Sequence, residues 1–202
     1  YQVGRIIARP FYGKPGEFIR DNANRRDFAL NPPTPNLLTV LQEKEREVLA
    51  VGKIDDIFAH VGISKAVHTK DNMDGVDQTL ALYQNMQNGL LFTNLVEFDS
   101  KYGHRRDVLG YTKALTDFDR RLPEIVAALD EETLLIITAD HGCDPAYRGT
   151  DHTREYVPFL IYHKQFSSPG ALPTGQSLGA TVADYLEVEY ALPGQSFLAR
   201  LK

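Results

Sequence analysis

The chain has 202 residues, of which 43% are hydrophobic and 24% charged, and this size and composition fit one globular domain with at most a small appendage. Its net charge of −5 argues against a nucleic-acid partner, because nucleic-acid binders usually present a basic surface. No apolar run approaches the roughly 18 residues that cross a bilayer, so we expect no membrane span, and the single cysteine, Cys143, is typical of a reducing compartment such as the cytoplasm.

The first 35 residues differ in character from the rest of the chain. Residues 3–11 (VGRIIARPF) have the apolar content of a strand, whereas residues 10–35 are dense in Pro, Gly, Asn and Arg. That composition predicts a connector or an exposed loop rather than part of the core. Because the chain opens at Tyr1 in what resembles the middle of a strand, we expect it to be part of a longer protein.

Strand and helix patterns alternate through the remainder. Apolar runs at 47–54, 90–99, 133–140 and 156–163 indicate strands, and amphipathic patterns at 36–46, 74–87, 107–129 and 177–188 indicate helices. The last three strand runs hardly alternate with polar residues, which is typical of strands buried on both faces. The order predicts an α/β fold with a mostly parallel sheet flanked by helices.

Two helix starts and one interruption can be assigned to residues. Asn36 and Asp107 precede their apolar patterns and are good N-cap residues. Pro123 lies inside the pattern at 107–129, where it predicts a kink or a break into two helices.

Acidic and imidazole side chains gather where two of the predicted strands end. Asp99 and Asp140 end their strands, His104 and His141 follow them closely, and His152 lies in a later loop. The carboxyl ends of parallel strands share one edge of a sheet, where ligands bind. Imidazole and carboxylate together suit divalent ions, and two ions about 4 Å apart can clamp a transferring phosphoryl group.

An ordinary reading remains open for each of these residues. An Asp at the end of a strand is often only a turn former, so the metal interpretation depends on the combination. His60, His68 and His163 have no such company and are expected to be ordinary histidines, and Cys143 is set aside as a ligand. The stretch 71–77 (DNMDGVD) fails as a calcium loop, because Met73 stands where an oxygen ligand is required.

Basic residues could hold a phosphate group elsewhere. Lys53 lies at the end of the strand at 47–54 and points to the same sheet edge. Arginines are dense near the N-terminus, and guanidinium groups bind phosphate well. Those arginines are Arg5, Arg9, Arg20, Arg25 and Arg26. For Arg105 and Arg106, a solvated surface is the commoner reading and a phosphate contact the alternative.

Three segments taken in order, LVEFDSKYGHRRD, TADHGCDP and GTDHTREYVP, closely resemble the metal-site motifs of bacterial phosphopentomutases. VGRIIARPF, AVGKI and TKDNMDG resemble flanking segments, so the resemblance covers nearly the whole chain. These enzymes belong to the alkaline phosphatase superfamily and interconvert ribose 1-phosphate and ribose 5-phosphate, and the deoxyribose equivalents, with two Mn²⁺ ions. The resemblance implies a cytoplasmic isomerase of nucleoside catabolism, activated by a sugar bisphosphate such as glucose 1,6-bisphosphate.

The resemblance also implies roles for individual residues. Asp99, His104 and His152 would ligate one ion, and Asp140 and His141 would ligate the other, which we expect to be held more weakly. Arg5 and Arg20 resemble arginines that hold the sugar phosphate, and Lys53 resembles an active-site lysine.

The sequence departs from the family in its extent. The phosphorylated threonine of the family lies in a half that this chain does not match, so no catalytic nucleophile is expected here. Residues 1–30 would end the inserted cap domain, and residues 31–202 would form the C-terminal part of an alkaline phosphatase-like core. The chain should therefore be inactive alone and require the N-terminal half of the same polypeptide. The alternatives are a cofactor-independent phosphoglycerate mutase or a phosphatase of the same superfamily, or a non-catalytic metal-binding domain.

Overall fold

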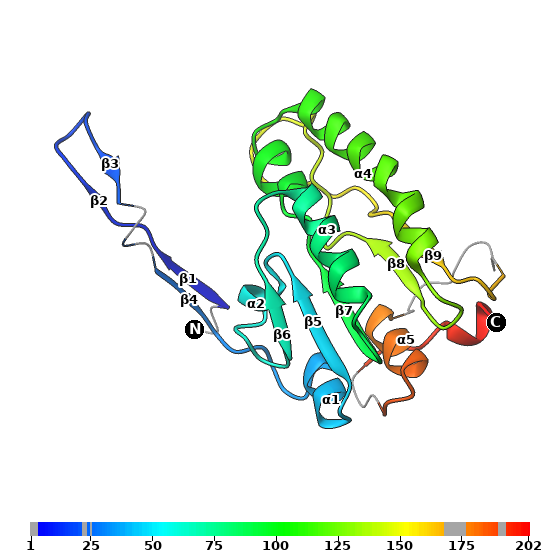
Figure 1. Cartoon of the computed structure of the whole chain (residues 1–202). Coiled ribbons are helices and arrows are strands. Elements are labelled where there is room, and N and C mark those ends of the chain that lie inside the picture. The colour runs from blue at the N-terminus through cyan, green and yellow to red at the C-terminus, as the bar shows by residue number, and fades with distance from the viewer. Residues whose placement is uncertain (1–3, 22–23, 25, 168–176, 190–192) are drawn as a thin grey trace.

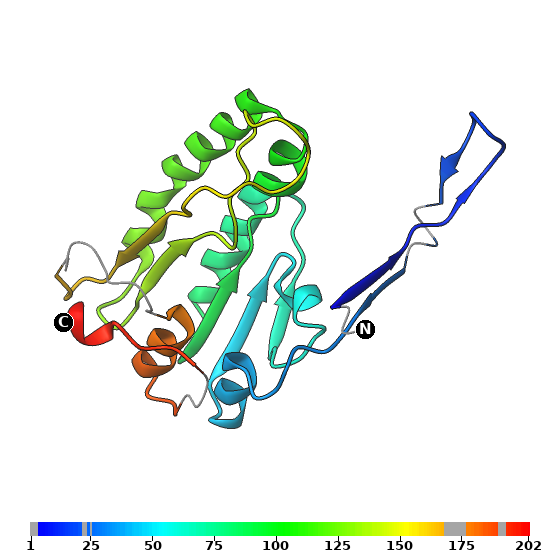
Figure 2. The same ribbon diagram turned by 180° about the vertical axis from the view of Figure 1, so that it is seen from behind.

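The fold consists of an α/β core and a long, thin arm that stands off it (Figures 1 and 2). The structure is a computed structural model, and it describes residues 4–21, 24, 26–167, 177–189 and 193–202. Among these residues, none of the helices combines the length and apolar character needed to cross a bilayer.

The arm is built from short antiparallel strands. The pair nearer the core is β1 (Arg5–Ala8) with β4 (Arg26–Ala29), and the pair nearer the tip is β2 (Phe11–Tyr12) with β3 (Ile19–Arg20). A turn closes the tip, where the Glu17 amide donates to Lys14 O over 2.8 Å. The expectation of a connector or loop over residues 10–35 is therefore wrong for β2, β3 and β4, because strands of two to four residues leave too little pattern among turn-forming residues.

The centre of the core is a three-stranded parallel sheet in the order β6-β5-β7. Its strands are β5 (Glu47–Val51), β6 (Lys65–Val67) and β7 (Gly89–Thr93), and its helices are α1 (Leu37–Glu43), α2 (Ile54–Ile57) and α3 (Asn72–Tyr83). The strand β6 was not predicted, since three residues carry little periodic signal.

The second part of the core continues with a π-helix and a long α-helix. These are η2 (Phe98–Gly103) and α4 (Val108–Ala128), followed by the antiparallel pair β8 (Leu135–Thr138) and β9 (Phe159–Tyr162), then α5 (Leu178–Tyr185) and the 3₁₀ turn η3 (Leu198–Arg200). In both ribbon views β8 and β9 continue the line β6-β5-β7, with β8 next to β7 (Figures 1 and 2). No hydrogen-bonded pairing joins β7 to β8 within the described chain.

The strand β5 organises the hydrophobic core from both of its faces. On one face, Val48 packs with Leu38 and Leu41 of α1 and with residues of α5 and the segment after it. On the other face, Leu49 and Val51 pack with Leu82 of α3. Burial on both faces was predicted for the runs at 90–99, 133–140 and 156–163, and it is wrong for them. Their residues are mostly half-buried or exposed, because β7 and β8 each keep one open edge and β9 is antiparallel.

Several local expectations can be compared with the structure. The Asn36 and Asp107 caps are confirmed, since their side chains accept from Leu38 N and Gly110 N, respectively. The run at 90–99 is not one strand, because β7 ends at Thr93 and Asp99 lies in η2. Pro123 does not break the helix at 107–129, since α4 runs without interruption to Ala128.

Candidate metal centre

Asp99, His104 and His152 bring three ligand atoms together at one end of the core. One carboxylate oxygen of Asp99, Oδ1, lies 3.3 Å from His104 Nε2 and 3.2 Å from His152 Nε2. One ligand atom from each residue falls within 4.8 Å of the others. Atoms that share an ion at about 2.1 Å, with tetrahedral or octahedral angles, stand roughly 3.0 to 3.5 Å apart. The two short distances therefore fit a common divalent ion.

The π-helix places the first two of these side chains. In η2 the amide of His104 donates to the carbonyl of Asp99 over 3.0 Å, which is the five-residue hydrogen bond of a π turn. Residues five apart on an ordinary α-helix point in different directions, whereas this wider turn sets Asp99 and His104 side by side. Such turns are frequent at functional sites.

The loop after β8 returns His152 to the same place. An isolated bridge pairs Gly142 with Thr153, and the Thr153 amide donates to Gly142 O over 3.0 Å. The loop between them therefore closes on itself, and the ring of His152 stacks on that of His141 with centroids 3.6 Å apart. The two histidines are eleven residues apart in the sequence but adjacent in space.

A backbone carbonyl fixes the ring of His104 in a state that can bind metal. Its Nδ1 lies 2.5 Å from the carbonyl oxygen of Thr150, which can only accept a hydrogen bond. Nδ1 must therefore carry the proton, and Nε2, which faces Asp99, keeps its lone pair when the ring is neutral. Metal-binding histidines commonly use the second ring nitrogen in this way.

Asp140 and His141 lie beside this cluster but offer fewer ligands. Asp140 Oδ2 is 3.4 Å from His141 Nε2, and the Asp140 side chain is 79% exposed. Its exposure contrasts with that of Asp99, whose side chain is 39% exposed. The stacking of His141 on His152 joins all five predicted ligands in one region.

Cys143 and Tyr111 lie close to Asp99 and remain neutral neighbours. The Cys143 thiol points to Asp99 Oδ1 over 3.9 Å, and burial, followed by the negative charge of Asp99, raises the pKa of this thiol. Burial is also the main reason that the pKa of Tyr111 is raised.

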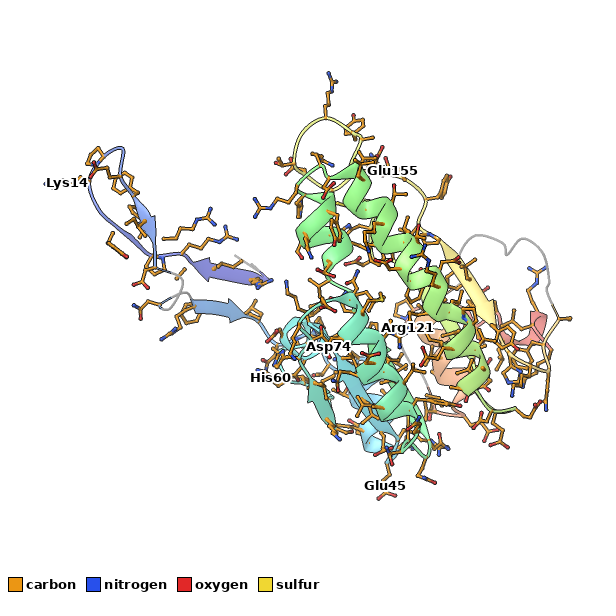
Figure 3. All side chains as sticks on the ribbon, turned by 45° about the horizontal axis from the view of Figure 1, so that its top comes forward. Lys14, Glu45, His60, Asp74, Arg121 and Glu155 are labelled. Carbon is orange, nitrogen blue, oxygen red and sulfur yellow. The ribbon has the colours of Figure 1, made fainter. Side chains whose placement is uncertain are left out.

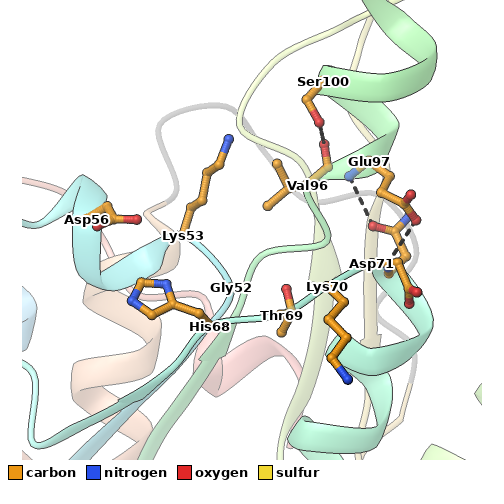
Figure 4. Close-up of a pocket in the computed structure, with 11 residues that line it drawn as sticks. Gly52, Lys53, Asp56, His68, Thr69, Lys70, Asp71, Val96, Glu97 and Ser100 are labelled. Atoms are coloured by element: carbon orange, nitrogen blue, oxygen red, sulfur yellow. Dashed lines mark hydrogen bonds between the residues drawn. The ribbon is translucent and has the colours of Figure 1, made fainter. Parts of the chain in front are cut away.

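Lys53 lines a polar pocket at the carboxyl edge of the parallel sheet. The pocket has a volume of about 290 Å³, close to the lower limit for small-molecule sites. Figure 4 shows the Lys53 side chain directed toward Val96 and Ser100, of which Ser100 lies in η2. Besides Lys53, its lining includes Gly52, Asp56, His68, Lys70, Asn72 and Glu97.

The structure does not bring Arg5 and Arg20 to the cluster. They lie on β1 and β3 of the arm, where both are exposed. Figure 3 places Lys14 at the tip of the arm and Glu155, three residues after His152, on the opposite side of the view. The arm would have to approach the core for either arginine to act with the metal cluster.

Sequence reasoning missed residues that hold the site together. Asn72 and Glu97 exchange two hydrogen bonds. The backbone amide of Asn72 donates to Glu97 Oε2 over 2.9 Å, and the backbone amide of Glu97 donates to Asn72 Oδ1 over 3.0 Å. This pair ties the start of α3 to the residue before η2.

Two further residues of the site were expected to be ordinary surface or core residues. Arg106, read as a surface arginine, contacts the loop that carries His152, and His68 lines the pocket. His60 pairs with Asp55 and the buried His163 stacks on Phe166, both outside the cluster as expected.

Comparisons with known proteins relate the chain to phosphopentomutases. It is 51% identical over 200 residues to a phosphopentomutase from Alkaliphilus metalliredigens and 55% identical over 199 residues to one from Clostridioides difficile. These matches cover 98% and 96% of the chain but 51% of each relative. The chain thus spans about half the length of the curated relatives that it matches.

Fold and family comparisons agree with this. The structure of the PH0037 protein from Pyrococcus horikoshii superimposes with a TM-score of 0.55 at 17% identity, over 71% of this chain and 45% of that one, which supports the fold. A model of the metalloenzyme superfamily matches residues 40–190. That match includes all five candidate metal ligands and extends over most of the sequence, so the chain belongs to the metalloenzyme superfamily.

Proposed function

We propose that this chain is the metal-binding part of a phosphopentomutase, a cytoplasmic enzyme of nucleoside catabolism that interconverts (deoxy)ribose 1-phosphate and (deoxy)ribose 5-phosphate. One observation carries the proposal. A chain at least 51% identical to two phosphopentomutases gathers Asp99, His104 and His152 around one point. In this proposal residues 1–30 end a cap domain and residues 31–202 complete the metal-binding core.

Two Mn²⁺ ions would be held at this end of the core. Asp99, His104 and His152 would hold one, and Asp140 with His141 would hold the other, with further ligands from outside the chain. When bound, such ions neutralise charge on a transferring phosphoryl group. The chain's own side chains orient the site: the Thr150 carbonyl keeps the His104 proton on Nδ1, and Asp99 faces both ring nitrogens.

The substrate is a small sugar phosphate, and basic side chains would position it. Lys53 stands in a pocket whose wall continues into η2, so a phosphate bound there would approach the metal cluster. Arg5 and Arg20 would reach the substrate from the arm. The nucleophilic threonine and the response to glucose 1,6-bisphosphate require the half of the enzyme that this chain does not match.

The surface of the chain supports a large complementary partner. Its accessible surface is 13596 Å², whereas a folded monomer of 22.7 kDa exposes roughly 9500 Å². Part of this excess belongs to the arm, which stands off the core, and part to apolar side chains of the core such as Leu160 that a partner could cover. We take that partner to be the N-terminal half of the same polypeptide.

Co-expression tests this function. The chain would be produced together with the part of the Clostridioides difficile relative that it does not match, and the purified complex assayed with Mn²⁺ on ribose 5-phosphate and on phosphoglycerate. We expect ribose 1-phosphate from the first substrate, no turnover of the second, and no activity from the chain alone.

His152→Ala in the same complex is the control, and it should abolish activity at low Mn²⁺. Turnover of phosphoglycerate would favour the related mutase. An assembled complex with bound Mn²⁺ and no mutase activity would favour a non-catalytic metal-binding domain.

A further inference from the structure

One arginine side chain contacts three points of the loop that carries His152. Arg106 Nη1 donates to the carbonyl of Asp144 over 2.6 Å, Nη2 donates to that of Asp151 over 2.9 Å, and Nε donates to that of Gly149. We propose that Arg106 is a positioning residue, which folds residues 144–151 into the shape that brings His152 to Asp99. The inference rests on the proposed metal function, because its consequence is metal binding.

The loop has few other contacts that could fix its shape. The structure assigns it to turns and bends, and Gly149 has a φ of 91°. Within the loop, the Tyr147 amide donates to Asp144 O over 3.2 Å and the Ala146 amide donates to Asp144 Oδ1 over 2.7 Å, so both contacts lie at its beginning. The loop is pinned at its ends, where the Asp144 amide donates to Thr153 Oγ1 over 2.7 Å. Three of its carbonyls, those of Asp144, Gly149 and Asp151, converge on the guanidinium group.

The same loop controls the two histidines that face Asp99. It carries Thr150, whose carbonyl accepts from His104, and it leads directly into His152. A shift of the loop would therefore release the ring of His104 and move His152 away from Asp99. Since the ligand atoms already stand about 3 Å apart, a displacement of 1 Å would spoil the geometry of a shared ion.

The backbone of Arg106 indicates that its side chain is required. Its φ is +57°, a conformation that costs a non-glycine residue about 1 kcal/mol or more. A glycine would relieve this cost but would lose the guanidinium group. A lysine would keep the charge, yet its ammonium cannot reach three carbonyls in the planar arrangement of a guanidinium fork.

Arg105 provides a matched control in the adjacent position. It has the same side chain and directly follows His104 in the sequence, but it is exposed, and none of the hydrogen bonds or ion pairs of the described residues uses it. The sequence reading of a solvated arginine applies to Arg105 and not to Arg106. Comparing the two arginines separates geometry from the general effect of positive charge near the site.

The test measures Mn²⁺ binding to the 202-residue chain by calorimetric titration, with Co²⁺ absorption as a report on the coordination geometry. We expect Arg106→Lys to weaken Mn²⁺ binding by about 10- to 100-fold and to change the Co²⁺ spectrum. Arg105→Lys should match the wild type in both measurements. Equal binding by the two variants would overturn the proposal.

Hydrogen exchange of the metal-free chain gives a second, independent readout. Arg106→Lys should accelerate exchange of amides in residues 144–151 and leave those of β5 unchanged, while Arg105→Lys should accelerate neither. Unchanged exchange in the loop would refute the role of Arg106 even if no variant binds metal. If the wild type binds no Mn²⁺ but Arg106→Lys still accelerates exchange in residues 144–151, the role of Arg106 stands and the proposed metal function is contradicted. Arg106→Gln is the alternative variant should the lysine form not fold.

Discussion

At the scale of single residues, the candidate centre depends most on Asp99. Its Oδ1 faces two histidine nitrogens at 3.3 and 3.2 Å, so one carboxylate supplies both a ligand and the negative charge that opposes a cation. Asp140 is more exposed and has one histidine beside it. The two aspartates should therefore contribute unequally to ion binding.

Replacing each aspartate by its amide tests this difference. Asp99→Asn keeps the shape but removes the charge, and it should weaken Mn²⁺ binding to the chain by at least about 100-fold, a larger effect than that of losing a supporting residue. Asp140→Asn should cost less than about tenfold at the stronger site. Titration calorimetry would show the contrast, and a larger loss for Asp140→Asn would reverse the assignment of the stronger site.

The sequence predicted the clustering of the candidate ligands better than it predicted the residues that orient them. Asp99, His104 and His152 could be recognised because metal-binding side chains are chemically distinctive. Arg106 binds backbone carbonyl oxygens, which every residue possesses, so its hydrogen-bond partners cannot be identified from residue types. Asn72 and Glu97 were missed for a related reason, since each of them binds the backbone amide of the other.

At the scale of elements, η2 is the part of the fold on which the cluster most depends. The Asn72–Glu97 pair anchors its beginning, and Lys101 donates to Glu97 Oε1 over 2.6 Å, a contact that raises the pKa of Lys101. Asn72 is 2% exposed, so this anchor is shielded from water. Gly103 ends the π-helix and lies against Cys143.

Gly103→Ala should therefore disturb η2 directly. A Cβ at this position would collide with Cys143 Sγ and lie 2.8 Å from Phe98 O, so the helix or the loop after β8 must shift. We expect a loss of about 1 to 3 kcal/mol in the free energy of unfolding, measured with urea, together with weaker Mn²⁺ binding. Gly4→Ala is the control, because a Cβ there meets no atom within 4 Å. Equal stability of the two variants would show that the contact with Cys143 is easily relaxed.

Element prediction succeeded where local chemistry and the hydrophobic pattern agreed. The helices begin where Asn36 and Asp107 can cap them, and both caps form. The prediction of a single strand over residues 90–99 failed, because a continuous apolar run does not show where a strand ends and a helix begins. Its last part is a π-helix, whose five-residue hydrogen bonding has no distinct sequence pattern. Pro123 leaves α4 continuous, so, of the kink or break expected there, the break is wrong.

At the scale of the whole molecule, the chain exposes several large apolar side chains. Leu160 of β9 is 56% exposed, and Phe11, Phe18 and Ile19 near the tip of the arm are 64%, 56% and 55% exposed. In the described chain β7 pairs only with β5, and β8 pairs only with β9. The sequence predicted the α/β class, yet it could not reveal these openings, because apolar strands look alike whether their neighbours lie in the same chain or beyond it.

The open edges of β7 and β8 lead to a final prediction. Half of the amides in each strand point away from its paired neighbour, and in the chain alone they should exchange with solvent hydrogen quickly. If the rest of the enzyme inserts a strand between β7 and β8, those amides should become protected when the chain is co-expressed with the unmatched half of the Clostridioides difficile relative. The outward-facing amides of β6, at the opposite edge, serve as the internal control and should not change. Protection of β6 without β7 and β8 would place the partner on the wrong edge, since only a strand next to β7 and β8 would also approach the segments that lead to Asp99 and Asp140.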